Sequence, residues 1–252
     1  MKSVKMLSFI LLILLGTHIT RAQDKTTNKP TIIFVHGVWA DGSSFVDQIT
    51  ALQSKGYNVI SVQNPVTSLD DDVAATKRAI AMAPGKVILV GHSWGGFVIT
   101  QAGNDPKVSG LVYIAAFAPD SGESVATLSS KGPATDISKY FIPSGEFIFL
   151  SKEGMQKSFA QDLSIKLQNL IYATQIPLKQ SAFNDKSISP AWKEKASWYI
   201  VTKQDKALSP ELQRFMSKRI KARTVEIESG HVAMFSHSKE ILGVIEEAAS
   251  AQ

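Results

Sequence analysis

The sequence of 252 residues contains no cysteine. This absence excludes disulfide bonds and a lipid-modified N-terminus of the bacterial lipoprotein kind, so the fold must depend on its hydrophobic core. The nucleotide-binding motifs G-x-G-x-x-G and G-x-x-x-x-G-K-[ST] are also absent. The apolar run Phe9–Leu15 is too short for a membrane span, which needs about 20 residues. With 44% apolar residues, the chain nevertheless has ample material for a large core.

The first 22 residues have the pattern of a secretory signal peptide. Lys2 and Lys5 precede the apolar run, and Thr20 and Ala22 are small residues at the positions that a signal peptidase reads. We therefore expect cleavage after Ala22, a periplasmic or secreted protein, and no membrane span once the signal is removed. A retained membrane anchor is the alternative.

The basic net charge of +5 is partly a property of this N-terminal segment. Its removal takes away Lys2, Lys5 and Arg21 but no acidic residue, so the formal charge falls to +2. The densest basic group that remains, residues 218–223, lies near the end of an expected helix, where positive charge is favourable to the helix dipole. The sequence therefore predicts no nucleic-acid partner.

Strand and helix patterns alternate along most of the chain, and the strands are apolar on both faces. This alternation predicts an α/β fold with a mostly parallel sheet of about six strands and helices on both faces. The expected strands are residues 30–37, 58–63, 86–92, 108–118, 196–205 and 223–229, and the expected helices are residues 45–54, 70–83, 95–103, 209–221 and 238–251.

The alternation breaks at Pro119 and resumes after Pro190. Residues 120–190 have a helical and irregular pattern with no clear strand, which indicates an insertion. We therefore expect a core made of residues 23–119 and 191–252 and a helical cap made of residues 120–190.

A serine stands inside a glycine cluster where an expected strand meets an expected helix. Gly91–Gly95 matches G-x-S-x-G, and this strand-to-helix context is what gives the motif meaning. The flanking glycines let strand and helix approach closely, so Ser93 can present its hydroxyl at the end of the sheet. Ser93 is thus the candidate nucleophile, with an ordinary glycine-rich connection as the alternative.

A serine nucleophile needs a histidine base and an acid that orients this base. His231 follows the last expected strand and is the candidate base, whereas His237 is expected to lie on the surface. Asp205 ends the preceding expected strand and is the candidate acid. Asp120, Glu123 and Asp185 are alternatives for this role.

Acyl transfer also needs N–H donors for the oxyanion. One donor is expected to be the main-chain N–H of Trp94, and the other the N–H of Val38, in the loop that follows the first strand. Trp39 and Phe117 are candidates for the substrate pocket. The side chains of Trp39 and Trp94 either line the acyl pocket or simply bury apolar area.

The order Ser93, Asp205, His231 and the motifs around it resemble the alpha/beta-hydrolase superfamily. The segments HGVWADGSSF, VTSLDDDVAAT, LVGHSWGG, LVYIAAFAPDSGES and SGHVAMFS are similar to its compact branch of bacterial carboxylesterases, plant methylesterases and hydroxynitrile lyases. The resemblance covers essentially all of the chain after the signal. It implies that residues 120–190 cap the active site and that the two short strands that open larger members are missing.

The sequence departs from some of these relatives. The lyases use a threonine of the first loop and a lysine after the catalytic histidine, and Gly37 and Val232 stand at the matching positions. Ser93 likewise excludes the dehalogenases and epoxide hydrolases of this fold, which attack with an aspartate. The bulk of Trp94 is expected to narrow or reshape the acyl side.

The sequence therefore predicts an exported serine hydrolase, a carboxylesterase that cleaves small to medium uncharged esters through an acyl-enzyme. A slow-turnover ligand sensor and a hydrolase of amide, lactone or C–C bonds are the alternatives. The expected partner is a small-molecule ester, and no metal or organic cofactor is expected. The apolar entrance of the cap is attributed to Phe141, Phe147, Phe149, Leu150, Phe159 and Leu170.

Overall fold

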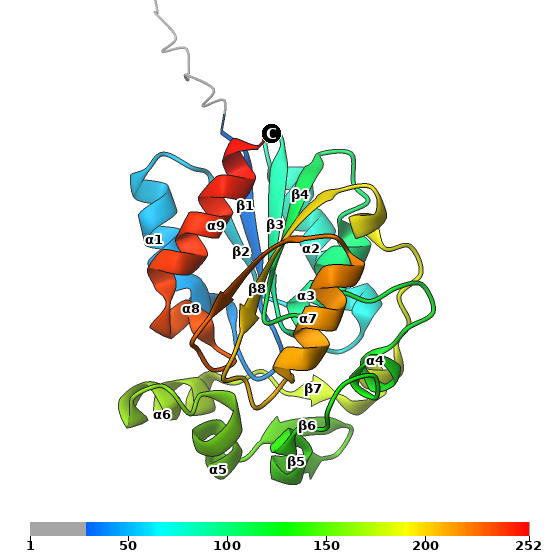
Figure 1. The fold of residues 1–252 in the computed structure, drawn as a ribbon, viewed down its shortest axis with the longest axis vertical. Helices are drawn as coiled ribbons and strands as arrows, with labels where there is room; N and C mark the ends of the chain where they lie inside the picture. Colours follow the sequence, from blue (N-terminus) through cyan, green and yellow to red (C-terminus); the bar gives the residue numbers. More distant parts are fainter. Residues whose placement is uncertain (1–28, 252) are drawn as a thin grey trace, which may run out of the picture.

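A six-stranded sheet forms the centre of the molecule (Figure 1). The computed structural model describes residues 29–251, so the predicted signal peptide lies outside the described residues. The strand order is β2-β1-β3-β4-β8-β9, and every neighbouring pair is parallel, as the sequence predicts. The strands are β1 (Thr31–Val35), β2 (Val59–Val62), β3 (Val87–His92), β4 (Val108–Ile114), β8 (Ala196–Thr202) and β9 (Arg223–Ile227).

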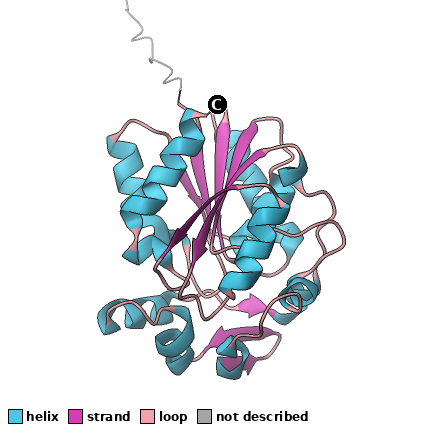
Figure 2. Cartoon of the chain, in the orientation of Figure 1, coloured by secondary structure: helices cyan, strands magenta, loops and turns pink. Residues whose placement is uncertain are grey.

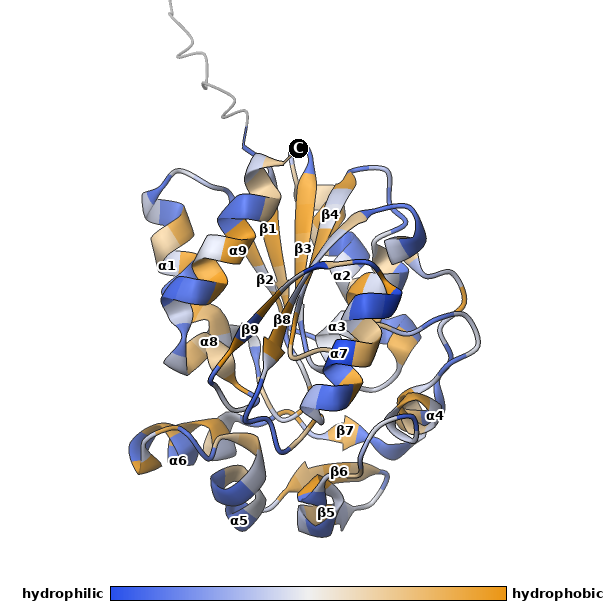
Figure 3. Cartoon of the chain, in the orientation of Figure 1, coloured by the Kyte–Doolittle hydropathy of each residue, from blue (hydrophilic) through white to orange (hydrophobic). Residues whose placement is uncertain are grey.

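Helices cover both faces of this sheet and explain why its central strands are apolar on both sides. α9 packs on β3, β4 and β8 and contacts α1, whereas α2 and α3 contact each other and β1. β1 and β3 are buried along their whole length, and Figure 3 shows these central strands in hydrophobic colours. The core helices are α1 (Val46–Ser54), α2 (Leu69–Met82), α3 (Trp94–Ala102), α7 (Pro210–Arg219), α8 (Ala233–Ser236) and α9 (Ser238–Ser250).

The insertion between β4 and β8 lies below the sheet in Figure 1. We call its residues 120–190 the cap. The prediction that the cap lacks strands is wrong, because three antiparallel strands in the order β5-β6-β7 stand among its helices (Figure 2). The cap elements are β5 (Phe141–Ser144), β6 (Phe147–Leu150), β7 (Leu178–Lys179), α4 (Val125–Ser129), α5 (Lys152–Gly154) and α6 (Ile165–Thr174).

A two-residue hairpin joins β5 to β6. Ser144 pairs with Phe147, and Gly145 between them has φ +58°, a value that favours glycine in the tight turns of hairpins. Pro143 normally argues against a strand because it cannot donate a hydrogen bond within a sheet. It is tolerated here because β5 is an edge strand.

The parallel strands end facing the cap, so the loops that follow β1, β3, β8 and β9 gather between the sheet and the cap (Figure 1). These loops carry the residues singled out in the sequence. Among residues 29–251, no helix is both long and apolar enough to cross a membrane.

Candidate active site

Ser93 occupies a strained turn between β3 and α3. Its backbone has φ 52° and ψ −120°, a combination that costs a non-glycine residue about 1–3 kcal/mol. Three main-chain hydrogen bonds hold it there: Ser93 N donates to Ile114 O (3.2 Å), and Ser93 O accepts from Gly96 N (3.0 Å) and Phe117 N (3.1 Å). The surrounding core thus compensates for the strain, and the hydroxyl stands at the end of the sheet.

Two glycines explain how the chain can crowd around this serine. A Cβ atom at Gly95 would lie 2.1 Å from the carbonyl oxygen of Val35, so α3 can start against β1 only if residue 95 is glycine. A Cβ atom at Gly37 would lie 2.7 Å from the Cβ of Ser93. The loop after β1 therefore packs directly on the serine, as a second source of oxyanion donors must.

His231 and Asp205 form a buried pair. The Nδ1 atom of His231 lies 2.7 Å from Oδ2 of Asp205, and the side chains are 2% and 0% exposed. Because an ionised carboxylate can only accept, Nδ1 carries the hydrogen in this pair and Nε2 is left as the basic nitrogen. This is the arrangement that a general base requires.

The carboxylate of Asp205 accepts four further hydrogen bonds. Thr202 Oγ1 (3.0 Å) and Gln213 Nε2 (2.8 Å) donate to Oδ2, and the N–H groups of Ala207 (2.8 Å) and Leu208 (2.9 Å) donate to Oδ1. Sequence reasoning missed Gln213 and Thr202. The available signal was a glutamine on the apolar face of the helix that follows the candidate acid.

The three alternative acids are engaged elsewhere. Asp120 forms an ion pair with Lys193 (2.7 Å), Glu123 binds Arg219, and Asp185 accepts from the N–H of Leu69 at the start of α2. Each of these three carboxylates therefore has a partner other than His231.

The other histidines near the serine are held neutral. His36 hydrogen-bonds through Nδ1 to Gly37 O (2.8 Å) and accepts from Asn64 N through Nε2, and Nε2 of His92 donates to the carbonyl of His231 (3.0 Å). Burial lowers the pKa of both imidazoles. Of the described histidines, His231 is the one that lines the cavity beside Ser93.

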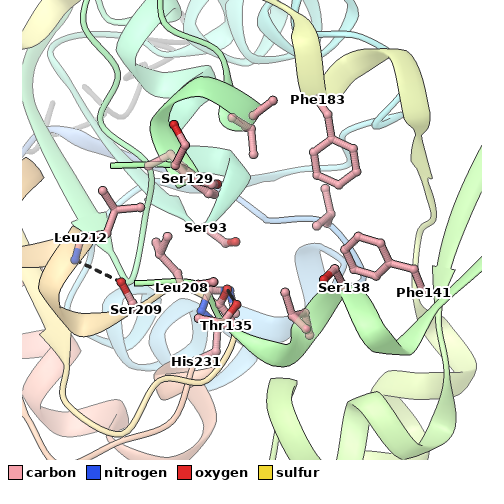
Figure 4. Close-up of a pocket in the computed structure, with 18 of the residues that line it drawn as sticks. Ser93, Ser129, Thr135, Ser138, Phe141, Phe183, Leu208, Ser209, Leu212 and His231 are labelled. Atoms are coloured by element: carbon pink, nitrogen blue, oxygen red, sulfur yellow. Dashed lines mark hydrogen bonds between the residues drawn. The ribbon is translucent and has the colours of Figure 1, made fainter. Parts of the chain in front are cut away.

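A cavity of about 570 Å³ opens beside Ser93 and His231. Figure 4 shows these two side chains with Phe141 and Phe183 across the cavity from them. Trp39 and Phe117, the candidates for the substrate pocket, line the cavity, and so does Val38. None of the described residues that line it is Asp, Glu, Lys or Arg.

The apolar cap residues singled out in the sequence contribute less to this cavity than expected. Phe141 lines it, but Phe159 and Leu150 are buried in the core and Leu170 is 57% exposed on the outside. Other parts of the apolar wall come from Val125 of α4, from Leu208 in the loop before α7 and from Leu212 of α7 itself.

Val38 and Trp94, the residues predicted to donate to the oxyanion, both lie beside Ser93. Val38 lies in the loop that packs on Ser93 and lines the cavity. Trp94 is the first residue of α3, so no carbonyl within the helix can accept its N–H. Trp39, which follows Val38 in the chain, donates two hydrogen bonds to the cap. Its main-chain N–H donates to Ile176 O (3.0 Å) and its indole N–H donates to Ile148 O (3.0 Å).

Of the two alternatives for the Trp94 side chain, the structure favours burial of apolar area, and the expectation that its bulk narrows the acyl side is wrong. Its indole is 2% exposed, stacks on Phe97 with ring centroids 5.4 Å apart, and donates to Oδ2 of Asp72 (2.7 Å). The side chain thus points into the core and anchors the first turn of α3. The partner, Asp72, could not be identified from the sequence because it lies on a different helix.

Asp72 is a buried carboxylate without a cation beside it. Oδ1 accepts from Val66 N (2.9 Å) and Oδ2 from Trp94, while Asp71 and Asp185 add negative charge nearby. Burial raises the pKa of Asp72 to about 6, against the effect of the two hydrogen bonds. The folded protein therefore holds this proton more tightly than the unfolded chain does.

This difference predicts a pH-dependent contribution to stability. The contribution is fully present below about pH 4, where Asp72 is protonated in both states, and is lost as the pH rises through about 6. The free energy of unfolding of the wild type, relative to that of Asp72→Asn, should fall by roughly 2–3 kcal/mol over this range. Urea unfolding of both proteins across the range measures it, and a constant difference would contradict the prediction.

Among the described residues, no group of three or more His, Asp or Glu side chains is arranged to hold a metal ion. The cavity instead brings together a hydroxyl and a base with its orienting acid, with the N–H groups of Val38 and Trp94 as candidate oxyanion donors. Such a set can carry out nucleophilic acyl transfer.

The chain resembles known proteins in both sequence and fold. The model of a family described as "Alpha/beta hydrolase family" matches residues 32–244. The chain is 32% identical over 124 residues to the carbendazim hydrolyzing esterase of Nocardioides sp. (strain SG-4G), an alignment that covers 44% of this chain and 51% of that protein. It is 24% identical over 255 residues to putative methylesterase 19 of Arabidopsis thaliana, which covers 88% of this chain and 98% of that protein. The solved structure of a pyrethroid hydrolase from Sphingobium faniae JZ-2 has the same fold, with a TM-score of 0.75 at 21% identity over 88% of this chain and 98% of that one.

Proposed function

Because this chain belongs to the alpha/beta hydrolase family, we propose that it is an exported serine carboxylesterase that cleaves small to medium uncharged esters. The observation that carries the proposal is the meeting of Ser93 with the His231–Asp205 pair at one cavity. The esterase relatives support the same reaction class.

The reaction proceeds in two halves. Ser93 Oγ attacks the ester carbonyl while Nε2 of His231 takes its proton, and Asp205 stabilises the resulting imidazolium. The negative oxygen of the tetrahedral intermediate accepts from the N–H groups of Val38 and Trp94. Collapse expels the alcohol, which leaves with the proton from His231.

Water completes the cycle. His231 takes a proton from a water molecule as this water attacks the acyl-enzyme, a second tetrahedral intermediate forms at the same donors, and the carboxylic acid departs. Ser93 Oγ regains its proton from His231. Every step uses groups of this chain and water.

The cavity supports the choice of uncharged substrates. Its volume of about 570 Å³ suits a small to medium ligand, and its walls are mainly aliphatic and aromatic. A charged substrate would lose its hydration on entering the cavity and would find no Asp, Glu, Lys or Arg side chain there as a counter-ion. Neutral acyl or aryl esters are favoured for this reason.

Export is proposed from the N-terminal sequence alone. Residues 1–22 combine two lysines, the apolar run Phe9–Leu15 and a small residue at the expected cleavage site. The proposed setting is the periplasm or the extracellular medium.

A matched pair of chromogenic esters tests the proposal. We expect kcat/KM for 4-nitrophenyl butyrate to exceed that for 4-nitrophenyl hemisuccinate by at least about tenfold, because burying the extra carboxylate is unfavourable. Equal or faster cleavage of the anionic ester would contradict the substrate class. Turnover of neutral esters below about 0.01 per second would favour a ligand-sensing role instead.

A further inference from the structure

One segment of the cap contacts the core beside both members of the acid–base pair. It comprises residues 158–162, which lie at the end of the π-helical turn η3 (Met155–Phe159) and just after it. We call these five residues the clasp. Irregular helical turns of this kind are frequent at functional sites.

The clasp binds the chain on each side of Asp205. Ser158 Oγ donates to the carbonyl of Lys206 (2.8 Å), and Gln161 Nε2 donates to the carbonyl of Gln204 (2.8 Å). Two hydrogen bonds from one segment therefore fix the two peptide carbonyls that flank the acid.

The same segment binds the loop that carries the base. Oδ2 of Asp162 accepts from the N–H of Gly230 (2.9 Å), from Ser229 Oγ (3.2 Å) and from Ser236 Oγ (3.2 Å). Gly230 immediately precedes His231, so this carboxylate fixes the chain at the point where the imidazole departs from it. Three donors would lose their shared acceptor if the carboxylate were removed.

The middle of the clasp covers the imidazole itself. The ring of Phe159 is fully buried and its centroid lies 5.2 Å from that of His231. The clasp thus restricts the rotation of the imidazole and shields the His231–Asp205 hydrogen bond from water, which strengthens that bond.

We propose that the clasp is a positioning element for the acid–base pair and that Asp162 is its principal positioning residue. The inference rests on the proposed esterase function. Of the five hydrogen bonds described above between the clasp and the core, four involve residues 204, 206, 229 and 230, the chain neighbours of the acid and the base, and the fifth comes from Ser236. Attachment of the cap alone would not require this concentration.

The clasp does not line the substrate cavity, so its loss should affect turnover and leave substrate binding nearly unchanged. A displacement of a catalytic group by about 1 Å can lower the rate by about 10²-fold. A role in cap attachment alone would instead lower stability and raise KM as the cavity wall loosens.

The experiment compares Asp162→Ala and Asp162→Asn with the wild type. We expect Asp162→Ala to lower kcat for 4-nitrophenyl butyrate, and the rate at which a fluorophosphonate modifies Ser93, by about 10–100-fold with KM within about threefold. Asp162→Asn keeps one oxygen that can accept from Gly230 and should retain more of both rates. Glu153→Ala, an exposed cap residue that pairs with Lys157, is the matched control and should behave like the wild type.

The positioning role would be overturned by wild-type rates in Asp162→Ala. A decrease in kcat/KM that came from a higher KM with an unchanged kcat would overturn it as well. If Asp162→Ala fails to fold, Asp162→Asn and Gln161→Ala carry the test, and wild-type kcat in both would overturn it equally. Failure of the fluorophosphonate to label wild-type Ser93 would overturn the proposed function, and the clasp inference with it. If the fluorophosphonate labels wild-type Ser93 but the variants keep wild-type rates, only the positioning role of the clasp is overturned, and the proposed function stands.

Discussion

Replacing Ser93 with glycine is expected to abolish ester hydrolysis and, at the same time, to stabilise the protein. The hydroxyl is the proposed nucleophile, and loss of such a group typically lowers kcat by about 10⁶-fold. The backbone at residue 93 has φ 52° and ψ −120°, a region that glycine enters without strain. After subtraction of the greater entropy of glycine in the unfolded chain, we expect the free energy of unfolding to rise by about 1 kcal/mol.

Ser93→Ala separates the two effects. It removes the hydroxyl but keeps a Cβ atom, so it should lose activity to the same extent without the gain in stability. Turnover of 4-nitrophenyl butyrate and urea unfolding measure the two quantities. More than about 1% residual activity in the alanine variant would refute the nucleophile, and equal stability of the two variants would show that the turn is not strained.

Replacing Asp205 with asparagine is expected to lower kcat by about 10⁴-fold while the fold persists. In the wild type, Oδ2 accepts from His231, Thr202 and Gln213. An amide NH₂ group in place of Oδ2 would face three donors. The imidazole would then place its hydrogen on Nε2, the nitrogen that must accept the proton of Ser93.

Rotating the amide does not relieve this conflict, because its NH₂ group would then face the N–H groups of Ala207 and Leu208. Asp120→Asn is the matched control: Asp120 also follows a strand of the sheet but pairs with Lys193, so its loss should leave kcat within about twofold. Steady-state kinetics and circular dichroism of both variants provide the measurement. A decrease of less than about tenfold in Asp205→Asn would mean that another group orients the base.

The sheet could be predicted from the sequence because its signals are local. Continuous apolar runs such as Val87–His92, punctuated by glycine and alternating with helical patterns, specify buried parallel strands. The cap hairpin escaped prediction because Pro143 within β5 argues against a strand unless the strand is known to lie at an edge. Edge position is a property of the assembled sheet and is not written in the local pattern.

The same distinction applies to the site. Ser93, Asp205 and His231 could be singled out because each follows a strand, and parallel strands bring their ends to one edge. Of the partners that hold them, Gln213 leaves a signal as a polar residue on the apolar face of α7, whereas Asp162 leaves none, because it contacts Gly230 across 68 positions of sequence. The direction of the Trp94 indole was likewise decided by a remote carboxylate.

The two hydrogen bonds of Trp39 link the cap to the loop that follows β1. Val38, whose N–H is the proposed oxyanion donor, immediately precedes Trp39, which donates hydrogen bonds to the carbonyls of Ile148 and Ile176. A cap transplanted from a relative would therefore have to supply carbonyls at both positions. Without them, the N–H of Val38 would no longer be held in position. For an engineer, broadening the range of accepted esters by cap exchange and preserving speed become one and the same design problem.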